Sequence, residues 1–292
     1  MSTRRRIEIV LAGLLLLLLA LDQAFAPPVP ADDRGTVVLA RDGTPLRTWP
    51  GTDGVWRHSV TPEEVSPLYL DALLAYEDRW FYWHPGVNPF ALGRASWQWL
   101  RQGRVVSGGS TLTMQVARML DPPAPLERRT LKAKLRQLLR ALQLELRLSK
   151  REILMLYLDH APMGGIVEGV EMASRAYLGK SSRDLGVAEA ALLAGLPQSP
   201  SRLRPDRAPD AARAARDKVL DRMVRLGRWS QAMVDDARIE RVAVLPIRGQ
   251  WLAPLAAERV RQISRQRGRP RQPVLRTTID PELQSTVERV LL

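Results

Sequence analysis

The chain contains no cysteine, only three histidines and few aromatic residues. Without cysteine it forms no disulfide, zinc–thiolate site or iron–sulfur cluster, and it has no cysteine nucleophile. The histidines His58, His84 and His160 lie far apart in the sequence, which argues against a histidine-rich metal site. Hydrophobic residues still make up 45% of the 292 residues, enough for a sizeable core. The composition excludes a disordered or collagen-like chain and predicts one large domain or two of modest size.

Lysine is also scarce, although the net charge is +13. Only five of the 44 basic residues are lysines, so arginine carries almost all of the excess. Such a charge suggests an anionic partner, whether nucleic acid, anionic lipid headgroups or a phosphate-bearing substrate. Arginine-rich coding by the genome would produce the same bias, so both explanations stay open.

An apolar run from Ile9 to Leu21 follows three arginines at positions 4–6. Positive charge before an apolar segment is typical of a signal peptide or of a membrane anchor with a cytoplasmic N-terminus. The uninterrupted run of 13 residues fits a signal peptide, whereas the 20 residues from Ile7 to Ala26 approach the length of a membrane span. Both interpretations place everything after residue 26 outside the cytoplasmic membrane, which argues against nucleic acid as a partner.

The segment that ends this run favours an anchor over a cleaved peptide. Residues 24–26 read Ala-Phe-Ala, which resembles a cleavage site, but Pro27 directly after it fits poorly. We therefore expect an uncleaved transmembrane signal-anchor over residues 7–26, preceded by a cytoplasmic basic tail at 1–6. The rest of a single-pass protein of this kind would lie outside the cytoplasmic membrane.

The rest of the chain predicts a mainly helical domain after one β-hairpin. Residues 27–34 read as a tether, and Gly35–Pro50 reads as a hairpin with its turn at 41–44. Apolar periodicity is helical from about Pro62, and near the C-terminus Val274–Ile279 reads as a strand. The expected helices, with Ser182 and Ser230 as N-caps, are Pro67–Trp83, one from Ser110, Glu127–Leu158 with a break near Ser149, Ser182–Gly195, Pro209–Leu226, Ser230–Arg241 and Pro281–Leu292.

The first candidate site is a carboxylate on an apolar helix face. Glu77 shares helical spacing with Leu70, Leu73, Leu74 and Phe81. A charge on such a face is either paired or functional, because a buried bare charge is costly. One interpretation is a salt bridge to an arginine such as Arg79. The other is a general acid or base whose pKa is tuned by partial burial.

The second candidate site is a hydroxyl-rich helix start. Gly108 and Gly109 precede Ser110 and Thr111, and free backbone N–H groups with such hydroxyls form an anion-binding concavity. Gln115 and Arg118 lie on the next turns toward the same side. A capped helix after a flexible loop is the alternative. The segment is not a P-loop, because the Gly-Lys-Ser/Thr ending is absent.

The third candidate site lies on the long helix. Its apolar face consists of Leu131, Leu135, Leu138, Leu142 and Leu146. A neighbouring face is lined by Lys134, Gln137, Ala141 and Glu145. Lys134 at the edge of the core could hold a phosphate as a point charge, whereas the alternative is a solvated charged face.

The order of these sites resembles the peptidoglycan glycosyltransferase (family 51) domain of class A penicillin-binding proteins, most nearly the 1C type. The resemblance covers about residues 36–245. It rests on the three sites and on five further stretches, Ser149–Leu154, Tyr157–Asp159, Ala173–Lys180, Glu189–Gln198 and Ser201–Pro205.

The resemblance implies a mainly α, lysozyme-like glycosyltransferase fold with a small membrane-facing lobe. It also implies processive polymerisation of lipid II, with the growing lipid-linked glycan strand as donor, inversion of configuration and release of undecaprenyl pyrophosphate. By resemblance Glu77 is the catalytic base, and a divalent metal such as Mg or Mn is a candidate cofactor, although no convincing metal cage is visible in the sequence. Substrate contacts are expected from Arg94, Ser110, Thr111, Gln115, Arg118 and Lys134.

The chain departs from the family pattern at the third site. The family reads Arg-Lys-x-x-Glu, whereas this chain reads Ala133-Lys134-Leu135-Arg136-Gln137, so Gln137 replaces a second catalytic glutamate. Glutamine forms hydrogen bonds but cannot carry charge or transfer a proton. Arg136 or Arg129 could supply the lost arginine.

A second departure lies after residue 245. Residues 246–292 resemble a linker and the start of a transpeptidase domain, and the Ser-x-x-Lys, Ser-x-Asn and Lys-Thr-Gly elements of that domain are absent. The expected layout is therefore a tether and hairpin at 27–60 and a glycosyltransferase domain at 61–245, with no transpeptidase activity from this chain.

Two alternative functions remain beside the glycosyltransferase. Gln137 is compatible with a catalytically weak scaffold that binds other proteins of cell-wall synthesis. A lysozyme-like hydrolase would need two carboxylates across the scissile bond, and the third site offers only Gln137.

Overall fold

The computed structural model describes residue 5 and residues 35–51, 53–102, 109–124, 130–245, 252–266 and 274–291. The expected anchor at 7–26 lies outside the described residues, as do Gly108 and Arg129. In the part of the chain that the structure describes, no helix is long and apolar enough to span a bilayer. Two compact units divide the chain: the first comprises residues 1–30 and 84–149, the second residues 31–83 and 150–292.

The described part of the first unit is helical. It contains α3 (Pro89–Gln102), α4 (Leu112–Leu120) and α5 (Leu131–Arg147), and α4 packs against α5. Thr111 and Thr130 begin α4 and α5 as N-caps, because each hydroxyl accepts from the backbone N–H three residues on. Gly86 lies close to α5: it has a φ of +80°, and a Cβ there would lie 2.7 Å from Glu145 Cγ. Only glycine fits this approach without strain.

The apolar face predicted for α5 is not a buried face. Leu131, Leu135 and Leu146 are 85%, 56% and 80% exposed, whereas Ala141 and Leu144 are buried. The periodicity identified the helix correctly, but helix α4 packs on the side that carries Lys134 and Gln137. The small Ala141 side chain allows this close packing.

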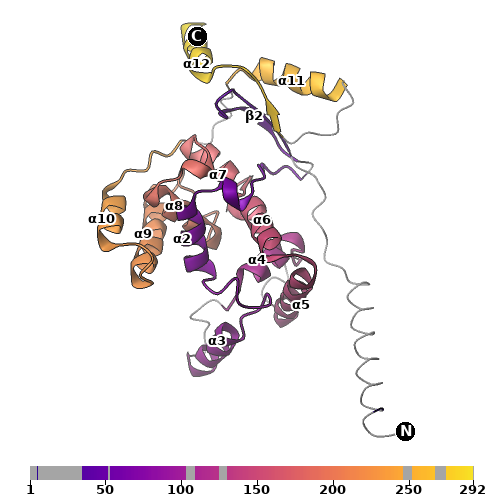
Figure 1. Cartoon of the computed structure of the whole chain (residues 1–292), viewed down its shortest axis with the longest axis vertical. Coiled ribbons are helices and arrows are strands. Elements are labelled where there is room, and N and C mark those ends of the chain that lie inside the picture. Colours follow the sequence, from indigo (N-terminus) through magenta and orange to yellow (C-terminus); the bar gives the residue numbers. More distant parts are fainter. Residues whose placement is uncertain are drawn as a thin grey trace. The chain divides into compact units, whose positions relative to one another are not determined.

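The second unit contains the principal helical core. Its helices are α2 (Pro67–Glu77), α6 (Lys150–His160), α7 (Val170–Leu178), α8 (Val187–Gly195), α9 (Pro209–Arg225) and α10 (Gln231–Ile239). Helix α8 packs against both α2 and α9 (Figure 1). Its residues from Ala190 to Gly195 are all buried, consistent with a run of alanine and leucine that is apolar on every side.

Short elements connect these helices. They are η1 (Pro62–Glu64), η2 (Ser182–Asp184), η3 (Leu196–Gln198) and the antiparallel strands β3 (Pro162–Gly164) and β4 (Val167–Glu168). The β3–β4 pair was not predicted, because its strands of three and two residues are too short to show a period of two.

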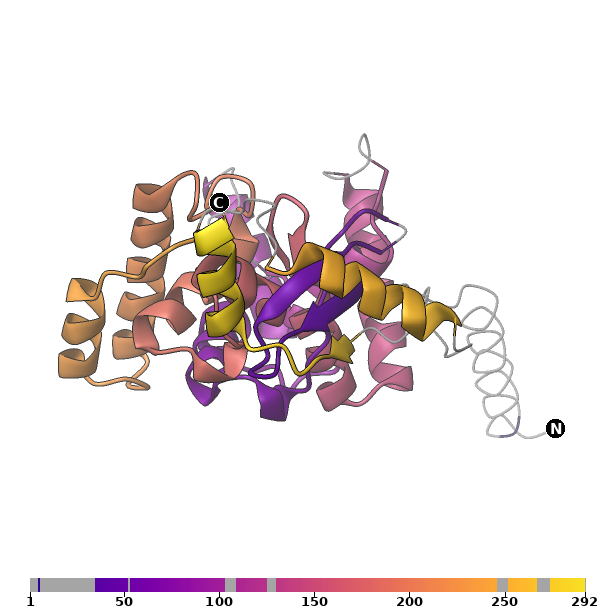
Figure 2. The same cartoon turned by 90° about the horizontal axis from the view of Figure 1, so that it is seen from above.

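A small sheet completes the second unit. Strands β1 (Thr36–Leu39) and β2 (Pro45–Trp49) form the predicted hairpin, and β5 (Val274–Arg276) pairs in parallel with β1. Helix α11 (Pro254–Gln266) lies along β1 and β2 (Figure 2), and α12 (Pro281–Leu291) follows β5. A separate apolar cluster forms between the sheet and α11, with buried members Val38, Ala40, Leu46, Ala253, Ala257 and Leu275.

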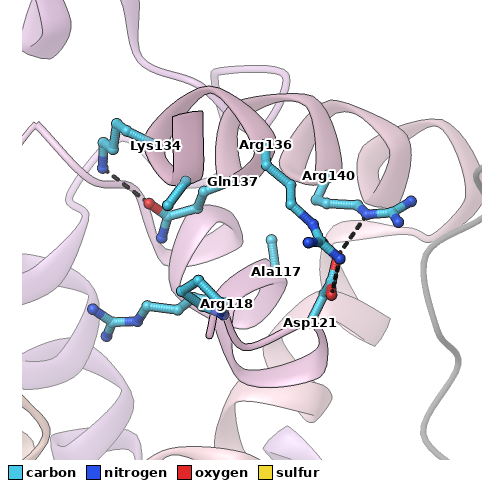
Figure 3. A pocket seen from close by; sticks show the side chains of 9 residues that line it. Ala117, Arg118, Asp121, Lys134, Arg136, Gln137 and Arg140 are labelled. Atoms are coloured by element: carbon cyan, nitrogen blue, oxygen red, sulfur yellow. Dashed lines mark hydrogen bonds and ion pairs between the residues drawn. The ribbon is translucent and has the colours of Figure 1, made fainter. Parts of the chain in front are cut away.

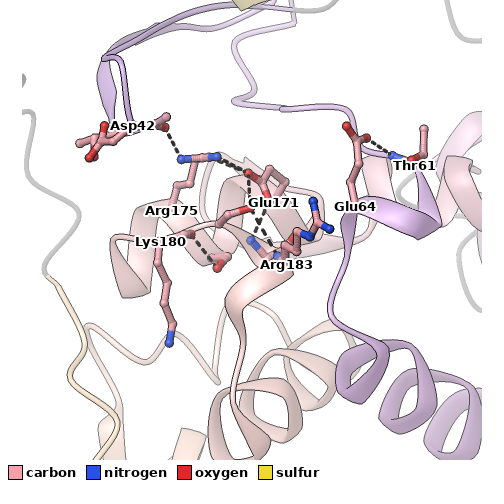
Figure 4. Close-up of polar contacts among 12 residues, drawn as sticks. Asp42, Thr61, Glu64, Glu171, Arg175, Lys180 and Arg183 are labelled. Carbon is pink, nitrogen blue, oxygen red and sulfur yellow. Dashed lines mark hydrogen bonds and ion pairs between the residues drawn. The ribbon is translucent and has the colours of Figure 1, made fainter. Parts of the chain in front are cut away.

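A polar network joins α7 to the β1–β2 turn (Figure 4). Arg175 donates to the backbone oxygen of Gly43 and forms an ion pair with Glu171 at 2.6 Å. Glu171 also accepts from the backbone N–H of Ser182 at 2.7 Å. Burial alone would raise the pKa of Glu171, but Arg175 and the Ser182 hydrogen bonds hold it below its usual value.

Several predicted boundaries were wrong for local reasons. The helix expected over Pro67–Trp83 ends at Glu77, because Asp78 adopts φ −160° and ψ 77°. The helix expected at Ser182–Gly195 is split into η2 and α8, and Ser181 caps η2 in place of Ser182. The break near Ser149, the start at Pro209 and the Ser230 cap are confirmed.

Candidate functional site

Glu77 is the last residue of α2, where the helix gives way to an irregular aromatic segment. Its neighbours on the predicted apolar face, Leu73 and Phe81, are fully buried. Glu77 itself is half-buried, and its Oε1 accepts from Gln198 Nε2 at 3.3 Å. The predicted partner Arg79 stacks on Trp80, with its Cζ 5.0 Å from the ring centroid.

The Glu77 carboxylate also affects its tyrosine neighbours. Burial raises the pKa of the Tyr76 hydroxyl, and the negative charge of Glu77 raises it further. The Tyr76 hydroxyl donates to Gln198 Oε1 at 3.2 Å, so a Tyr76–Gln198–Glu77 chain of hydrogen bonds forms. The Gln198 amide thus links the Tyr76 hydroxyl to the Glu77 carboxylate.

A cationic pocket lies in the first unit between α4 and α5 (Figure 3). Lys134 and Arg118 extend on one side of it, and Arg136, Arg140 and Asp121 meet on the other. The residues that line the pocket are Ala117, Arg118, Asp121, Pro123, Ala133, Lys134, Arg136, Gln137 and Arg140. Four cations against one carboxylate give it a positive potential suited to an anion.

Two neutral oxygen atoms hold the Lys134 ammonium. Its Nζ donates to Ser110 Oγ at 2.8 Å and to Gln137 Oε1 at 3.1 Å. Partial burial lowers the pKa of Lys134, and the nearby charge of Arg118 lowers it further. The structure thus brings together Ser110, Lys134 and Gln137, three residues singled out from two separate stretches of sequence.

On the other side of the pocket, Asp121 neutralises two arginines. Its carboxylate accepts from Arg136 Nη2 at 2.6 Å and from Arg140 Nε at 2.9 Å. Arg136, which the sequence offered as a substitute for the lost family arginine, is therefore engaged with Asp121. Neither Asp121 nor Arg140 was predicted as a site residue, although the i, i+4 spacing of Arg136 and Arg140 was a usable signal.

The remaining predicted contacts occupy different environments. Thr111 is 2% exposed, and its hydroxyl both accepts from Met114 N–H and donates to the backbone oxygen of Gly86. Gln115 is buried in α4, whereas Arg94 is exposed on α3. The capped-helix interpretation of this segment is thus correct for Thr111, and substrate contact by Thr111, Gln115 and Arg94 stays a prediction.

The donors of the pocket do not fit a divalent metal ion. Asp121 is engaged by two arginines, and the Gln137 oxygen faces an ammonium group. Among the described residues no group of three or more histidines or carboxylates could hold a metal.

Comparison with known proteins adds the family. The transglycosylase family model matches residues 42–224. The chain belongs to the transglycosylase family. The matched segment of this transglycosylase contains Glu77 and all of the cationic pocket.

Curated relatives of this transglycosylase are penicillin-binding proteins. Penicillin-binding protein 1C of Escherichia coli (strain K12) is 52% identical over 269 residues, which cover 92% of this chain and 34% of that protein. Penicillin-binding protein 1A of Aquifex aeolicus (strain VF5) is 37% identical over 188 residues, or 64% of this chain and 26% of that protein. The transglycosylase thus spans about a third or less of the length of these relatives.

Among solved structures, penicillin-binding protein 1A from Haemophilus influenzae matches 90% of the transglycosylase and 29% of its own chain. The sequence identity is 21% and the TM-score is 0.44.

Proposed function

We propose that this transglycosylase is a peptidoglycan glycosyltransferase that polymerises lipid II into glycan strands for the bacterial cell wall. The observation that carries the proposal is the family match over residues 42–224, which includes both a half-buried carboxylate and a cationic pocket. Relatives named as penicillin-binding proteins support a substrate of this class. The same proposal includes a lysozyme-like fold with a small membrane-facing lobe.

In this proposal Glu77 is the general base. It removes the proton from the 4-hydroxyl of the acceptor lipid II, and that oxygen then attacks the anomeric carbon of the donor strand. The bond from this carbon to the undecaprenyl pyrophosphate breaks as the new bond forms, so the configuration inverts. The hydrogen bond from Gln198 supports this role, because it holds one oxygen of the Glu77 carboxylate in place.

Lys134 and Arg118 would stabilise the negative charge that develops on the leaving pyrophosphate. Fixed cations aimed at developing charge are a large catalytic contribution, since they need no reorganisation during the reaction. Ser110 is proposed to contact the same anionic ligand, because its Oγ accepts a hydrogen bond from the Lys134 Nζ at 2.8 Å. Arg94, Thr111 and Gln115 are proposed as further polar contacts to the lipid-linked substrate.

The membrane is part of the proposal. Residues 7–26 would anchor the chain in the cytoplasmic membrane with residues 61–245 as the glycosyltransferase domain on the periplasmic side. A lipid-linked substrate supports this placement, since donor and acceptor are both confined to the membrane surface.

The test is polymer formation from labelled lipid II by the purified, detergent-solubilised chain. Glu77→Gln should lower the polymerisation rate by about 100-fold or more, because loss of a general base typically costs two to four orders of magnitude. Glu63→Gln is the matched control. It makes the same change at an exposed glutamate that pairs with Arg151, and it should keep the wild-type rate.

Three results would contradict the proposal in different ways. A folded wild-type chain that forms no polymer supports the scaffold interpretation. If Glu77→Gln polymerises lipid II at the wild-type rate, Glu77 is not the general base. Release of reducing ends from preformed glycan would point to the hydrolase.

A further inference from the structure

The Gln137 amide lies between one group that can only accept a hydrogen bond and one that can only donate. Its Nε2 donates to the backbone oxygen of Met114 at 2.7 Å, and its Oε1 accepts from Lys134 Nζ at 3.1 Å. A carbonyl oxygen has no proton to give and an ammonium has no lone pair, so only one orientation of the amide satisfies both neighbours. This geometry ties α5 to α4 and fixes the place of the Lys134 ammonium.

A carboxylate at position 137 would not fit the same surroundings. One of its oxygens would face the Met114 carbonyl oxygen, where two acceptors repel each other unless the acid is protonated. The other oxygen would pair with Lys134 and neutralise its charge. The amide avoids both effects, because it donates to Met114 and gives Lys134 an acceptor without a negative charge.

The charges around Lys134 make this distinction matter. Its second acceptor, the Ser110 hydroxyl, is also neutral. Arg118 on α4 adds a positive charge nearby, and the carboxylate that lines the pocket, Asp121, accepts from Arg136 and Arg140. The Lys134 ammonium is therefore positioned by uncharged oxygen atoms in a positive pocket.

We propose that Gln137 is a positioning residue that holds Lys134 while leaving its charge available to a phosphate-bearing ligand, and that this pocket requires an amide at position 137. The inference rests on the proposed function, since it assigns the pocket to the pyrophosphate of that reaction. In this role Gln137 contributes to ligand binding through Lys134, and the pocket needs no second carboxylate at position 137.

The first experiment measures inorganic pyrophosphate binding to the whole chain by calorimetry. Gln137→Glu should weaken binding by about tenfold, since one of the positive charges is neutralised. Gln137→Met removes both hydrogen bonds without adding charge, so it should bind more tightly than Gln137→Glu and more weakly than wild type. Gln102→Glu at the end of α3 is the matched control, because it makes the same change at an exposed glutamine that is not among the residues lining the pocket.

The second measurement follows the Lys134 side chain by NMR. Only five lysines are present, so the Lys134 signal can be assigned by its loss in Lys134→Met. In Gln137→Glu the pKa of Lys134 should rise, because a carboxylate stabilises the ammonium, and in Gln137→Met and Gln102→Glu it should not. A merely structural role for Gln137 would not produce this separation.

Lipid II polymerisation separates failure of the inference from failure of the proposed function. If Gln137→Glu binds pyrophosphate as tightly as wild type and polymerises faster, the requirement for an amide is wrong while the glycosyltransferase stands. If wild type makes no polymer but the binding order and the Lys134 shift occur as stated, the function is wrong while the role of Gln137 stands. Circular dichroism of each variant confirms that it is folded.

Discussion

At the scale of single residues, His58 is a histidine enclosed by charged groups. It is 9% exposed, and burial lowers its pKa to about 4 although the negative charge of Glu171 acts in the opposite direction. In the folded chain the ring thus stays neutral at pH values where a free histidine is half protonated. Because His58 is protonated in the unfolded chain and neutral in the folded chain at the same pH, the free energy of unfolding depends on pH.

This difference predicts a loss of stability under mildly acidic conditions. Below a pH of about 6.5 His58 binds a proton in the unfolded state, whereas in the folded state it binds one only near pH 4. The stability of the fold therefore decreases as the pH falls through this window. Between pH 7 and pH 5 the contribution is about 2 kcal/mol, from 1.36 kcal/mol per pK unit. Urea unfolding followed by circular dichroism should show a flatter pH dependence for His58→Gln than for wild type.

His160→Gln provides the comparison for that measurement. His160 lies at the end of α6 and is half-buried, so the same change is made at a second, less buried histidine. An equal flattening of the pH dependence in both variants would contradict the assignment to His58.

At the scale of elements, Arg175 connects helix α7 to the β1–β2 turn. Its guanidinium contacts both the buried Glu171 carboxylate and the backbone oxygen of Gly43. The side chain of Glu171 is 3% exposed, so removal of its cation leaves a buried charge that hydrogen bonds from Ser181 and Ser182 offset in part. The hairpin therefore depends on an ion pair that lies outside its own sheet.

Arg175→Met should consequently destabilise the second unit by about 3 kcal/mol, the lower end of the cost of breaking a buried ion pair. Amide hydrogen exchange of residues 42–44 should be faster, because the turn loses its contact with α7. Arg183→Met, an exposed arginine in η2, should change neither quantity. Unchanged exchange at the turn in Arg175→Met would show that the sheet alone holds the hairpin.

The elements that could be predicted from sequence are those whose signals are local. Pro209 and Ser230 mark the starts of α9 and α10, and residues 41–44 mark the hairpin turn. The end of α2 depends on the backbone of Asp78, for which the apolar pattern carries no signal. The parallel β1–β5 pair could not be derived either, because it joins segments far apart in the sequence.

The candidate site shows the same limit. Their i, i+3 spacing placed Lys134 and Gln137 on one face of a helix, and the structure shows a hydrogen bond between them. The contacts of Lys134 with Ser110 and of Gln198 with Glu77 join separate elements, and only the packed structure reveals them. The exposed leucines of α5 show that a period identifies a helix without saying which face is covered.

At the scale of the whole molecule, the net charge of +13 predicts an electrostatic attraction to anionic surfaces. The chain should bind vesicles that contain anionic lipid more tightly than neutral vesicles, and the difference should decrease as salt screens the charges. Cosedimentation with both kinds of vesicle at 50 mM and at 500 mM salt, about tenfold apart, measures this difference.

Neutral vesicles serve as the control in that experiment. The apolar run at 9–21 can insert into either kind of bilayer, so its contribution is common to both. Equal binding to the two vesicle types at low salt would show that the arginine excess does not act on membranes.

The parallel pairing of β1 with β5 also determines the order in which the chain can mature during synthesis. Val37 emerges from the ribosome on the order of 200 residues before its partner Val274, a delay of roughly 10–50 seconds at ordinary elongation rates. Until then one edge of β1 lacks a partner, and the apolar cluster that includes Leu275 and Ala257 is incomplete. The β1–β2 hairpin and the helical core can therefore form before β1 gains its second partner.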